Sequence, residues 1–447
     1  MAKEAKAPPA TGEAAAAGGT PDVWPDGTPI DAWFACTDGP RLEDLGARYV
    51  LTKHGILDDG RIHTAEIQTL IDRAAAAGGG VIVVPPGVYL TGSLFFKPGV
   101  NLYVAAGGML RGSRSLDDYA IGETRIEGET AIYVQALINA DGCDGFTMTG
   151  PGTIDGAGLD AWRSFWHRRT WNPDCTNKDE QRPRLVYISN SSDVTIAGLC
   201  LQNSWFWTTH IYRCDHVRYL GCRIFSPVSP VKAPSTDAID IDACTDVLVR
   251  GCTLEVNDDS VVLKGGKGPW ADIASENGSC ERILIEDCIY GFCHGCLTVG
   301  SECVHARNVL VRRLTVRDGK NLLWIKMRPD TPQRYEYITM EQVRATVDNG
   351  FVVRPWAQFF DLKGRDDLPP SVLENVTLRD CDLECAVLFD VHESDRYSLR
   401  DITLERLRGT ACERGADLSN VEGARVEDAT VCITGEPLSE RALEPQY

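Results

Sequence analysis

Acidic residues that could act together lie in two short stretches in the middle of the chain. Asp258 and Asp259 stand side by side in VNDDSVVLKGG, at the start of an apolar run typical of a β-strand. Asp237 lies 21 residues earlier in APSTDAIDIDAC, where alternation predicts that the isoleucines face inward and the aspartates outward. An isolated aspartate pair is more typical of a solvated turn. Three carboxylates held together repel one another, so one can keep a proton while the others stay ionised.

Histidine and basic residues follow these acids along the chain. His294 lies in GFCHGCLTVGSE, and Lys326 and Arg328 alternate with apolar residues in NLLWIKMRPD, beside Trp324. Hydrolysis of a glycosidic bond needs one carboxylic acid and one carboxylate, which such a cluster would provide. Other interpretations stay open, since His294 could be a core histidine and Lys326 a solvated residue at the rim of a cleft.

A repeated pattern supplies the elements that would bring these residues together. Eight segments, such as DVTIAGLCL at 193–201 and DVLVRGCTL at 246–254, combine alternating apolar residues with a small apolar residue at the seventh position. They begin 23 to 38 residues apart. This pattern predicts short parallel strands stacked into a solenoid, in which each coil buries its apolar face against the next. Because 21 residues is close to one coil, we expect Asp237 to lie beside Asp258 on the adjacent coil. The seventh positions are Leu199, Cys222, Cys252, Cys288, Leu314, Val343, Cys381 and Leu407.

The cysteines follow this register. Cys222, Cys252 and Cys288 alternate with Leu and Val at the same repeat position, so we expect them to be buried thiols in adjacent coils. A disulfide framework is the alternative. Cys293 and Cys296 form a CxxC, but no second CxxC follows at zinc spacing, so packing is the favoured interpretation over zinc binding or redox chemistry.

An amphipathic helix is predicted near residues 64–77, in HTAEIQTLIDRAAAAGGG, where it would cover the open end of the first coil. The expected fold class is therefore all-β, with an N-terminal capping helix on a parallel solenoid. Residues 1–44, which begin MAKEAKAPPATGEAAAAGG, are predicted to form a disordered or extended arm. Residues 45–447 would then form a single catalytic domain.

The overall charge limits the classes of partner. A net charge of −19 argues against binding to nucleic acid or to an anionic membrane through a general basic field. There is no run of 18 apolar residues, so no membrane span is predicted. An acidic substrate would need a locally basic cleft. The first residues lack the apolar region of a secretory signal, so we expect a cytoplasmic protein as written, or a secreted or periplasmic one if a signal has been removed.

Taken in order, these stretches resemble glycoside hydrolase family 28, the polygalacturonase and rhamnogalacturonan hydrolase family. The family pattern of NTD, DD, GHG and RIK corresponds to STD at 235–237, NDD at 257–259, CHG at 293–295 and WIK at 324–326. GTIDGAG, RPRLVYISN and NSWFWTTH, which ends at His210, also resemble the family. The resemblance covers roughly residues 45 to 430 and implies a right-handed parallel β-helix of the pectin-lyase-like kind.

The resemblance also implies roles for particular residues. Asp258 would protonate the leaving oxygen, Asp237 and Asp259 would hold the attacking water, and His294 would tune the protonation of the cluster. The product would have inverted configuration, which fits carboxylates far enough apart to hold that water. The partner would be a pectic, galacturonate-containing poly- or oligosaccharide, with no metal and no cofactor; the oligomeric state is left open. The substrate would be bound by Lys326, Arg328, Trp324 and His210. Lys326 would pair with a uronate carboxylate.

Two departures from the family pattern bear on the substrate. Ser235 replaces Asn, and Trp324 replaces the Arg of RIK, which removes a bidentate fork for a carboxylate. Rhamnogalacturonan hydrolases of the family also lack this Arg but depart from the DD and GHG patterns kept here. We therefore expect a polygalacturonase-like hydrolase, with inserts at 159–181 and 265–280 that favour an exo-acting cleft. A rhamnogalacturonan hydrolase, a calcium-dependent pectic lyase and a non-catalytic carbohydrate-binding solenoid are the alternatives.

Overall fold

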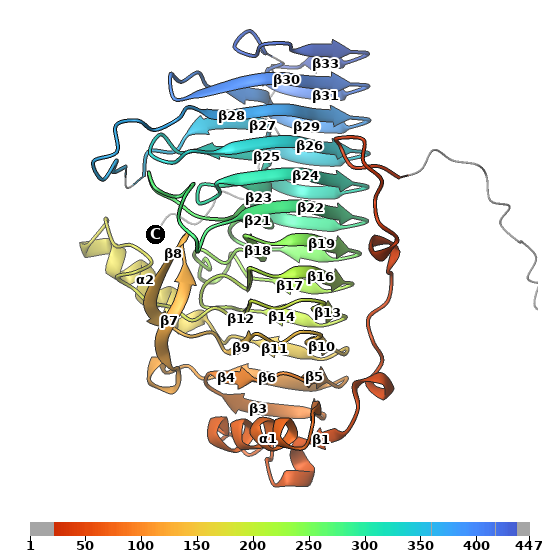
Figure 1. Cartoon of the computed structure of the whole chain (residues 1–447), viewed down its shortest axis with the longest axis vertical. Helices are drawn as coiled ribbons and strands as arrows, with labels where there is room; N and C mark the ends of the chain where they lie inside the picture. The colour runs from red at the N-terminus through yellow and green to blue at the C-terminus, as the bar shows by residue number, and fades with distance from the viewer. Residues whose placement is uncertain (1–21, 359, 416, 436–447) are drawn as a thin grey trace, which may run out of the picture.

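Short parallel strands stack one above another and form an elongated column (Figure 1). The computed structural model describes residues 22–358, 360–415 and 417–435. A 13-stranded sheet and an 18-stranded sheet make up the column, and the strands of neighbouring coils pair in parallel. The all-β parallel solenoid expected from the repeat is confirmed.

The two sheets draw one or more strands from each coil. The 13-stranded sheet contains β1 (Arg48–Val50), β2 (Gly80–Val84), β5 (Val100–Val104), β10 (Thr147–Thr149), β13 (Thr195–Ala197), β16 (Asp215–Leu220), β19 (Thr245–Arg250), β22 (Ser279–Glu286), β24 (His305–Arg312), β26 (Arg334–Glu341), β28 (Ser371–Arg379), β30 (Tyr397–Glu405) and β32 (Arg425–Glu427). The 18-stranded sheet contains β3 (Gly87–Thr91), β4 (Leu94–Phe96), β6 (Gly108–Gly112), β9 (Ile138–Asp141), β11 (Thr153–Asp155), β12 (Val186–Ser189), β14 (Cys200–Gln202), β15 (Thr209–Tyr212), β17 (Arg223–Phe225), β18 (Ile239–Asp242), β20 (Thr253–Glu255), β21 (Val261–Lys264), β23 (Ile289–Val299), β25 (Thr315–Met327), β27 (Arg344–Pro355), β29 (Asp382–Val391), β31 (Arg408–Arg414) and β33 (Thr430–Ile433).

Alternation along each strand decides which side chains enter the core. Ile188, Ile211, Ile241 and Leu263 occupy one register position in four successive coils and are fully buried. The residues next to them point outward, because successive side chains of a strand face opposite sides. Two outward rows therefore run along the column over the 18-stranded sheet. The first contains Asn139, Tyr187, His210, Asp240, Val262, Thr298 and Trp324, and the second contains Asp141, Ser189, Tyr212, Asp242 and Lys264.

Left-handed backbone turns set the corners of each coil. The first residue of every repeated segment has a φ between 49° and 57°. Asn and Asp tolerate this conformation better than other residues with a side chain, which explains why they often begin the segment. A second corner precedes the aligned cysteines, where Gly221 and Gly251 have φ values of 59° and 65°. The first residues are Asp193, His216, Asp246, Arg282, Asn308, Tyr337, Asn375 and Asp401.

The ladder of small apolar residues predicted from the repeat is confirmed. The Thr253 backbone N–H donates to the Cys222 carbonyl at 2.9 Å, and the Ile289 N–H donates to the Cys252 carbonyl at 3.0 Å. Cys222, Cys252 and Cys288 therefore lie in adjacent coils, and each is only 1% exposed. All three are free thiols, as expected. They fill the core as small hydrophobic residues.

A helix closes one end of the column. The helix α1 (Thr64–Ala76) confirms the amphipathic helix predicted near residues 64–77. Its buried face consists of Ile67, Leu70, Ile71 and Ala74, and it lies against the first coils (Figure 1). The N-cap residue is His63, and the side-chain oxygen of Thr64, the first residue of the helix, accepts a hydrogen bond from the Gly92 N–H at 2.6 Å.

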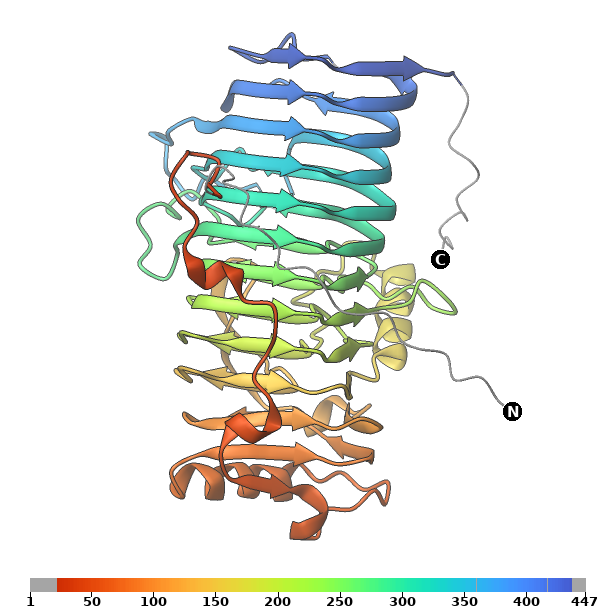
Figure 2. The same ribbon diagram turned by 90° about the vertical axis from the view of Figure 1, so that its right-hand side faces the viewer.

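The segment before the first coil runs along the side of the column (Figure 2). Its short helices are η1 (Ala32–Ala35) and η2 (Leu42–Leu45). Trp24 and Phe34 are buried against outward leucines of the 13-stranded sheet, including Leu248 and Leu284. Asp26 pairs with Arg307 at 3.0 Å. Residues 22–44 thus follow an extended path over the column, whereas the Ala- and Gly-rich residues 1–19 lie outside the described residues.

Two insertions stand beside the column near its middle (Figure 1). One is the antiparallel hairpin of β7 (Ile121–Ile126) and β8 (Glu129–Val134), and the other is the helix α2 (Leu159–Trp171). The remaining 3-10 helices are η3 (Leu51–His54) and η4 (Leu116–Asp118). Among the described residues, we find no helix with the length and apolar character needed to cross a membrane.

Candidate active site

The three acids singled out from the sequence meet at one point on the outer face of the column. One carboxylate oxygen from each of Asp237, Asp258 and Asp259 lies within 4.8 Å of the other two. Asp237 precedes β18, and the aspartate pair precedes β21 on the next coil. Because Ile239 pairs with Val261, Asp237 is level with Asp259, whereas the spacing in the sequence predicted that it would be level with Asp258.

The cluster is open to solvent at Asp258 and His294. The His294 backbone N–H donates to the Asp258 carbonyl at 2.8 Å, and its ring Nδ1 lies 3.7 Å from the Asp258 carboxylate. The side chains of Asp258 and His294 are 27% and 21% exposed, while those of Asp237 and Asp259 are 6% and 2% exposed. A substrate bound over the cluster would therefore meet Asp258 and His294 first.

Lys326 belongs to the acid cluster. Its Nζ donates to the Asp259 carboxylate at 2.9 Å and lies 4.0 Å from the ring centroid of Trp324 and 5.1 Å from that of Trp356. Burial disfavours its charge, but Asp259 and Asp258 outweigh burial and raise the Lys326 pKa. The structure thus places Lys326 against a carboxylate of the cluster, where the resemblance implied a uronate, and places the Trp324 ring against the ammonium.

A second buried lysine was not singled out from the sequence. Lys264, at the end of β21, lies 3.3 Å from Asp240, 3.5 Å from Glu302 and 4.0 Å from Asp237. Its Nζ is also 4.2 Å from the ring centroid of Trp207. Strand alternation was the available signal, since Lys264 follows the inward-facing Leu263 in VVLK and therefore had to point to the same outer face as the acids.

The pKa shifts in the cluster point in opposite directions. Burial, together with Asp258 and Asp240, holds the pKa of Asp237 well above its usual range. Burial raises the pKa of Asp240 to about 7. Burial also disfavours the charge of Asp258, but the neighbouring His294 outweighs it and the Asp258 pKa is lowered. Without substrate, these directions favour a proton on Asp237 over one on Asp258, whereas the resemblance implied that Asp258 carries it.

The same three acids are spaced as metal ligands could be. Two ammonium groups already supply positive charge at this point, since Lys326 is 2.9 Å from Asp259 and Lys264 is 4.0 Å from Asp237. A calcium ion would have to compete with both, because it prefers the same carboxylate oxygens. The donor set therefore fits proton transfer better than calcium binding.

Replacement of Asp240 by Asn should change how stability depends on pH. Because the folded-state pKa of Asp240 is raised to about 7, the folded protein binds more protons than the unfolded chain between about pH 4 and that value. The free energy of unfolding therefore falls as pH rises through this window, by at most about 1.4 kcal/mol per pH unit for this group. Denaturant titrations across this range should show the advantage of the wild type over Asp240→Asn shrinking as pH rises. A difference that does not change with pH would contradict this assignment.

His210 lies beneath the hairpin. Its ring contacts Arg184 at 2.7 Å through Nδ1 and Asp242 at 3.3 Å through Nε2, and the ring is fully buried. Arg125 of β7 reaches down to the same Asp242 at 3.2 Å. Burial lowers the pKa of His210 to about 3, so the ring is neutral. The expectation that His210 binds substrate does not fit this position, because the ring is fully buried between Arg184 and Asp242.

Arg328 is also committed within the protein. Its guanidinium makes two contacts of 2.9 Å with the carboxylate of Asp330, and the side chain is 4% exposed. This bidentate pair uses two of the guanidinium N–H donors that would otherwise bind the carboxylate of a uronate. Its guanidinium is therefore not placed to take over the role of the family Arg, whose position is occupied here by Trp324.

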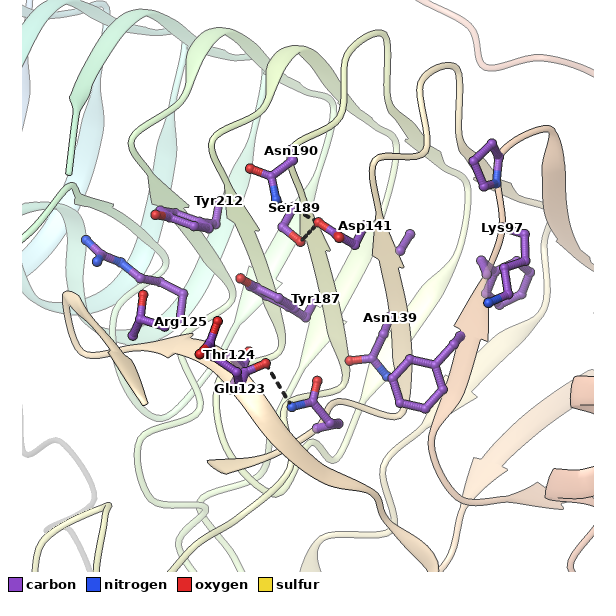
Figure 3. A pocket seen from close by; sticks show the side chains of 16 residues that line it. Lys97, Glu123, Thr124, Arg125, Asn139, Asp141, Tyr187, Ser189, Asn190 and Tyr212 are labelled. Atoms are coloured by element: carbon purple, nitrogen blue, oxygen red, sulfur yellow. Dashed lines mark hydrogen bonds between the residues drawn. The ribbon is translucent and has the colours of Figure 1, made fainter. Parts of the chain in front are cut away.

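A cavity of about 470 Å3 lies between the hairpin and the outer face of the 18-stranded sheet (Figure 3). Arg125 lines this cavity, with its guanidinium 4.9 Å from the ring centroid of Tyr212 and bonded to Asp242. The floor of this cavity is formed by outward side chains of β9, β12 and β15, including Asn139, Asp141, Tyr187, Ser189 and Tyr212.

Solved structures and curated proteins share this architecture and sequence pattern. A hyperthermoactive exopolygalacturonase from Thermotoga maritima superposes with a TM-score of 0.73 over 87% of this chain and 92% of that chain, at 20% identity. A probable endo-xylogalacturonan hydrolase A of Aspergillus fumigatus is 26% identical over 253 residues, which is 53% of this chain and 56% of the relative. An endo-polygalacturonase of Pectobacterium carotovorum subsp. carotovorum is 27% identical over 251 residues, 54% of this chain and 58% of the relative.

The chain spans about half the length of the curated relatives it matches. The fold shared with these structures is the right-handed parallel β-helix, as the resemblance implied. The sequence model described as glycosyl hydrolases family 28 matches residues 111–354, which include all three clustered acids, His294 and Lys326. Because this match covers more than half of the chain, the protein belongs to glycosyl hydrolases family 28.

Proposed function

We propose that the protein is an inverting glycoside hydrolase that cleaves galacturonosyl linkages in pectic poly- or oligosaccharides. The observation that carries this proposal is the cluster of three carboxylates within 4.8 Å, flanked by two buried lysines and exposed at one carboxylate and one histidine. The names of the curated relatives, endo-polygalacturonase and probable endo-xylogalacturonan hydrolase, support a galacturonate-containing substrate.

In this proposal Asp258 donates the proton to the leaving oxygen. It is the most exposed of the three acids, and His294 lies beside it. A bound sugar would exclude water from Asp258 and raise its pKa, so that Asp258 could carry the proton for the leaving oxygen. Asp237 and Asp259 would orient the attacking water.

The burial of the remaining acids favours inversion. A covalent intermediate requires a carboxylate that can reach the anomeric carbon. Asp259 is 2% exposed and bonded to Lys326, and Asp237 is 6% exposed beside Lys264. Neither can approach a sugar carbon without losing its lysine. Water held by these two acids is the nucleophile that fits their burial.

The hairpin turn favours exo action. A Cβ atom added at Gly128 would lie 2.9 Å from the Cβ of Glu302 and 3.1 Å from the backbone nitrogen of Lys267. The hairpin turn therefore packs directly against the loops beside the cluster. Arg125 fixes the hairpin through the buried Asp242. A rigid wall at this point would stop a polysaccharide from running past the carboxylates in both directions.

The alternatives fit less well. A rhamnogalacturonan hydrolase was suggested by Trp324, but the ring of Trp324 is occupied by Lys326 and the aspartate pair is kept. A calcium-dependent lyase would need its metal to displace the lysines. A carbohydrate-binding solenoid would not require a buried cluster of mutually repelling acids next to an exposed Asp–His pair.

Digestion of defined galacturonate oligosaccharides tests the proposal directly. We expect release of single galacturonate units from one end, because the hairpin closes the cleft. Proton NMR at early times should show the inverted anomer of the new reducing end. An ultraviolet-absorbing unsaturated product would indicate a lyase, and retained configuration would overturn the roles given to Asp237 and Asp259. A ladder of intermediate sizes would contradict exo action.

A further inference from the structure

A smaller cavity adjoins the acid cluster where the hairpin turn meets three loops. It has a volume of about 290 Å3. One lysine comes from each loop: Lys178 precedes β12, Lys267 follows β21, and Lys363 lies between β27 and β28. Glu129 at the start of β8 lies opposite them. We call the cavity lined by these three lysines the lysine pocket.

The three lysines converge on one carboxylate. Lys178 lies 2.8 Å from Glu129, Lys363 lies 3.7 Å away, and Lys267 lies 3.9 Å away. Burial disfavours the charge of Glu129, but the lysines outweigh it and lower its pKa. Glu129 therefore lies within reach of three ammonium groups, which is an arrangement suited to an anion of the size and charge of a uronate carboxylate.

The other charged side chains of the cavity are Glu127, Arg328, Asp330 and Asp361. Arg328 is bonded twice to Asp330. Glu127 accepts a hydrogen bond from Asn177 at 2.8 Å and lies 3.8 Å from Lys267. The lysines of the pocket are thus the cations of this cavity that a ligand carboxylate could recruit by displacing Glu129.

The side chain of Glu302 links the lysine pocket to the acid cluster, because both Lys264 of the cluster and Lys267 of the pocket act on its charge. Glu302 is contacted by Lys264 of the cluster at 3.5 Å, and the charges of Lys264, Lys267 and Lys326 together overcome burial and lower its pKa to about 2. Lys264 in turn lies 4.0 Å from Asp237. A sugar in the pocket would therefore be a neighbour of the sugar at the cluster.

We propose that the lysine pocket binds the carboxylate of a uronate sugar next to the scissile bond, and that Glu129 occupies this position when substrate is absent. The proposal rests on the proposed function and specifies which residues recognise the acidic sugar. It accounts for the loss of the family Arg at Trp324, since neither Lys326 nor Arg328 is available for this contact. Charge-assisted bonds to a carboxylate are strong and selective for the ionised form.

Single substitutions with opposite expected signs test this assignment. Lys178→Gln and Lys267→Gln should each raise KM for a galacturonate oligosaccharide by about tenfold, because each removes a charged hydrogen-bond donor. Glu129→Gln should lower the same KM, because it removes the competing carboxylate. The KM for a fully methyl-esterified oligosaccharide, which has no free carboxylate, should change little in all three variants.

The matched control is Lys97→Gln, an exposed lysine at the cavity between the hairpin and the 18-stranded sheet. It should leave both KM values unchanged. If the lysines and Glu129 serve only to fasten the hairpin, all three variants should raise KM for both substrates alike, and the proposal is then wrong. A wild-type enzyme that cleaves no galacturonate substrate would instead refute the proposed function. In that case, calorimetric titration of the Asp258→Asn and Asp258→Asn/Lys267→Gln proteins with free galacturonate would still decide whether the pocket binds the uronate.

Discussion

Asp258→Asn should lower kcat by about 10²–10⁴-fold, the usual contribution of general acid catalysis, while substrate still binds. The side chain keeps its shape, and the Asp258 backbone carbonyl that accepts from His294 at 2.8 Å is unchanged. The substitution removes the one acid of the cluster that a bound sugar can touch directly, since Asp237 and Asp259 are almost fully buried.

Initial rates and calorimetric titration with a galacturonate oligosaccharide would measure the two effects separately. Asp395→Asn is a suitable control, because Asp395 is exposed and lies on a turn after β29. A variant that keeps more than about a tenth of the wild-type kcat would mean that another group donates the proton. The raised pKa of Asp237 makes that acid the first candidate for the role.

The repeat makes the column predictable from the sequence alone. Strand side chains alternate with a period of two, so a stack of coils leaves the same residue types at the same position in each segment. The segment starts read from the sequence, such as Asp193 and Asn375, are the residues with left-handed backbone at the corners. The aligned cysteines were predictable for the same reason, because each shares its position with Leu or Val.

The cluster of acids was predictable to within one residue. Spacing placed Asp237 on the coil next to the aspartate pair, but Ile239 pairs with Val261, so Asp237 is level with Asp259 and not with Asp258. The three carboxylates still meet, because the bend before β21 brings both members of the pair to the outer face. A one-residue error of this kind cannot be resolved by counting residues between strands.

The position of the hairpin could not be predicted from the repeat. Residues 121–134 are an insertion, and only the folded chain shows that they lie over β15 and bury His210. The partners of Lys326 were hidden for a related reason. The outward orientation of Lys326 was predictable. Its contact with Asp259 was not, because it depends on how two coils joined through a loop are placed relative to each other. Roles that depend on insertions are therefore the ones that the sequence left open.

Lys264→Met should shift the acidic limb of the pH profile of kcat to higher pH and lower kcat at neutral pH. Burial opposes the charge of Lys264, but Glu302, Asp240 and Asp237 outweigh burial and hold its pKa well above the usual range. In return, its ammonium lowers the pKa of Asp237, Asp240 and Glu302. Methionine fills a similar volume without the charge, so the pKa of each buried acid should rise.

The direction of this shift follows from the role of the acids. Water activation needs an ionised carboxylate, and each acid that loses its cation binds its proton up to a higher pH. Removal of one partner from a buried ion pair typically costs about 3–5 kcal/mol, so unfolding should also occur at lower denaturant concentration. Lys264→Arg keeps the charge and should restore most of the wild-type pH profile. If Lys264→Met lowers kcat by the same factor at every pH, with no displacement of the acidic limb, Lys264 acts through packing alone. A displaced limb that Lys264→Arg returns would instead show that the positive charge at this position lowers the pKa of the buried acids.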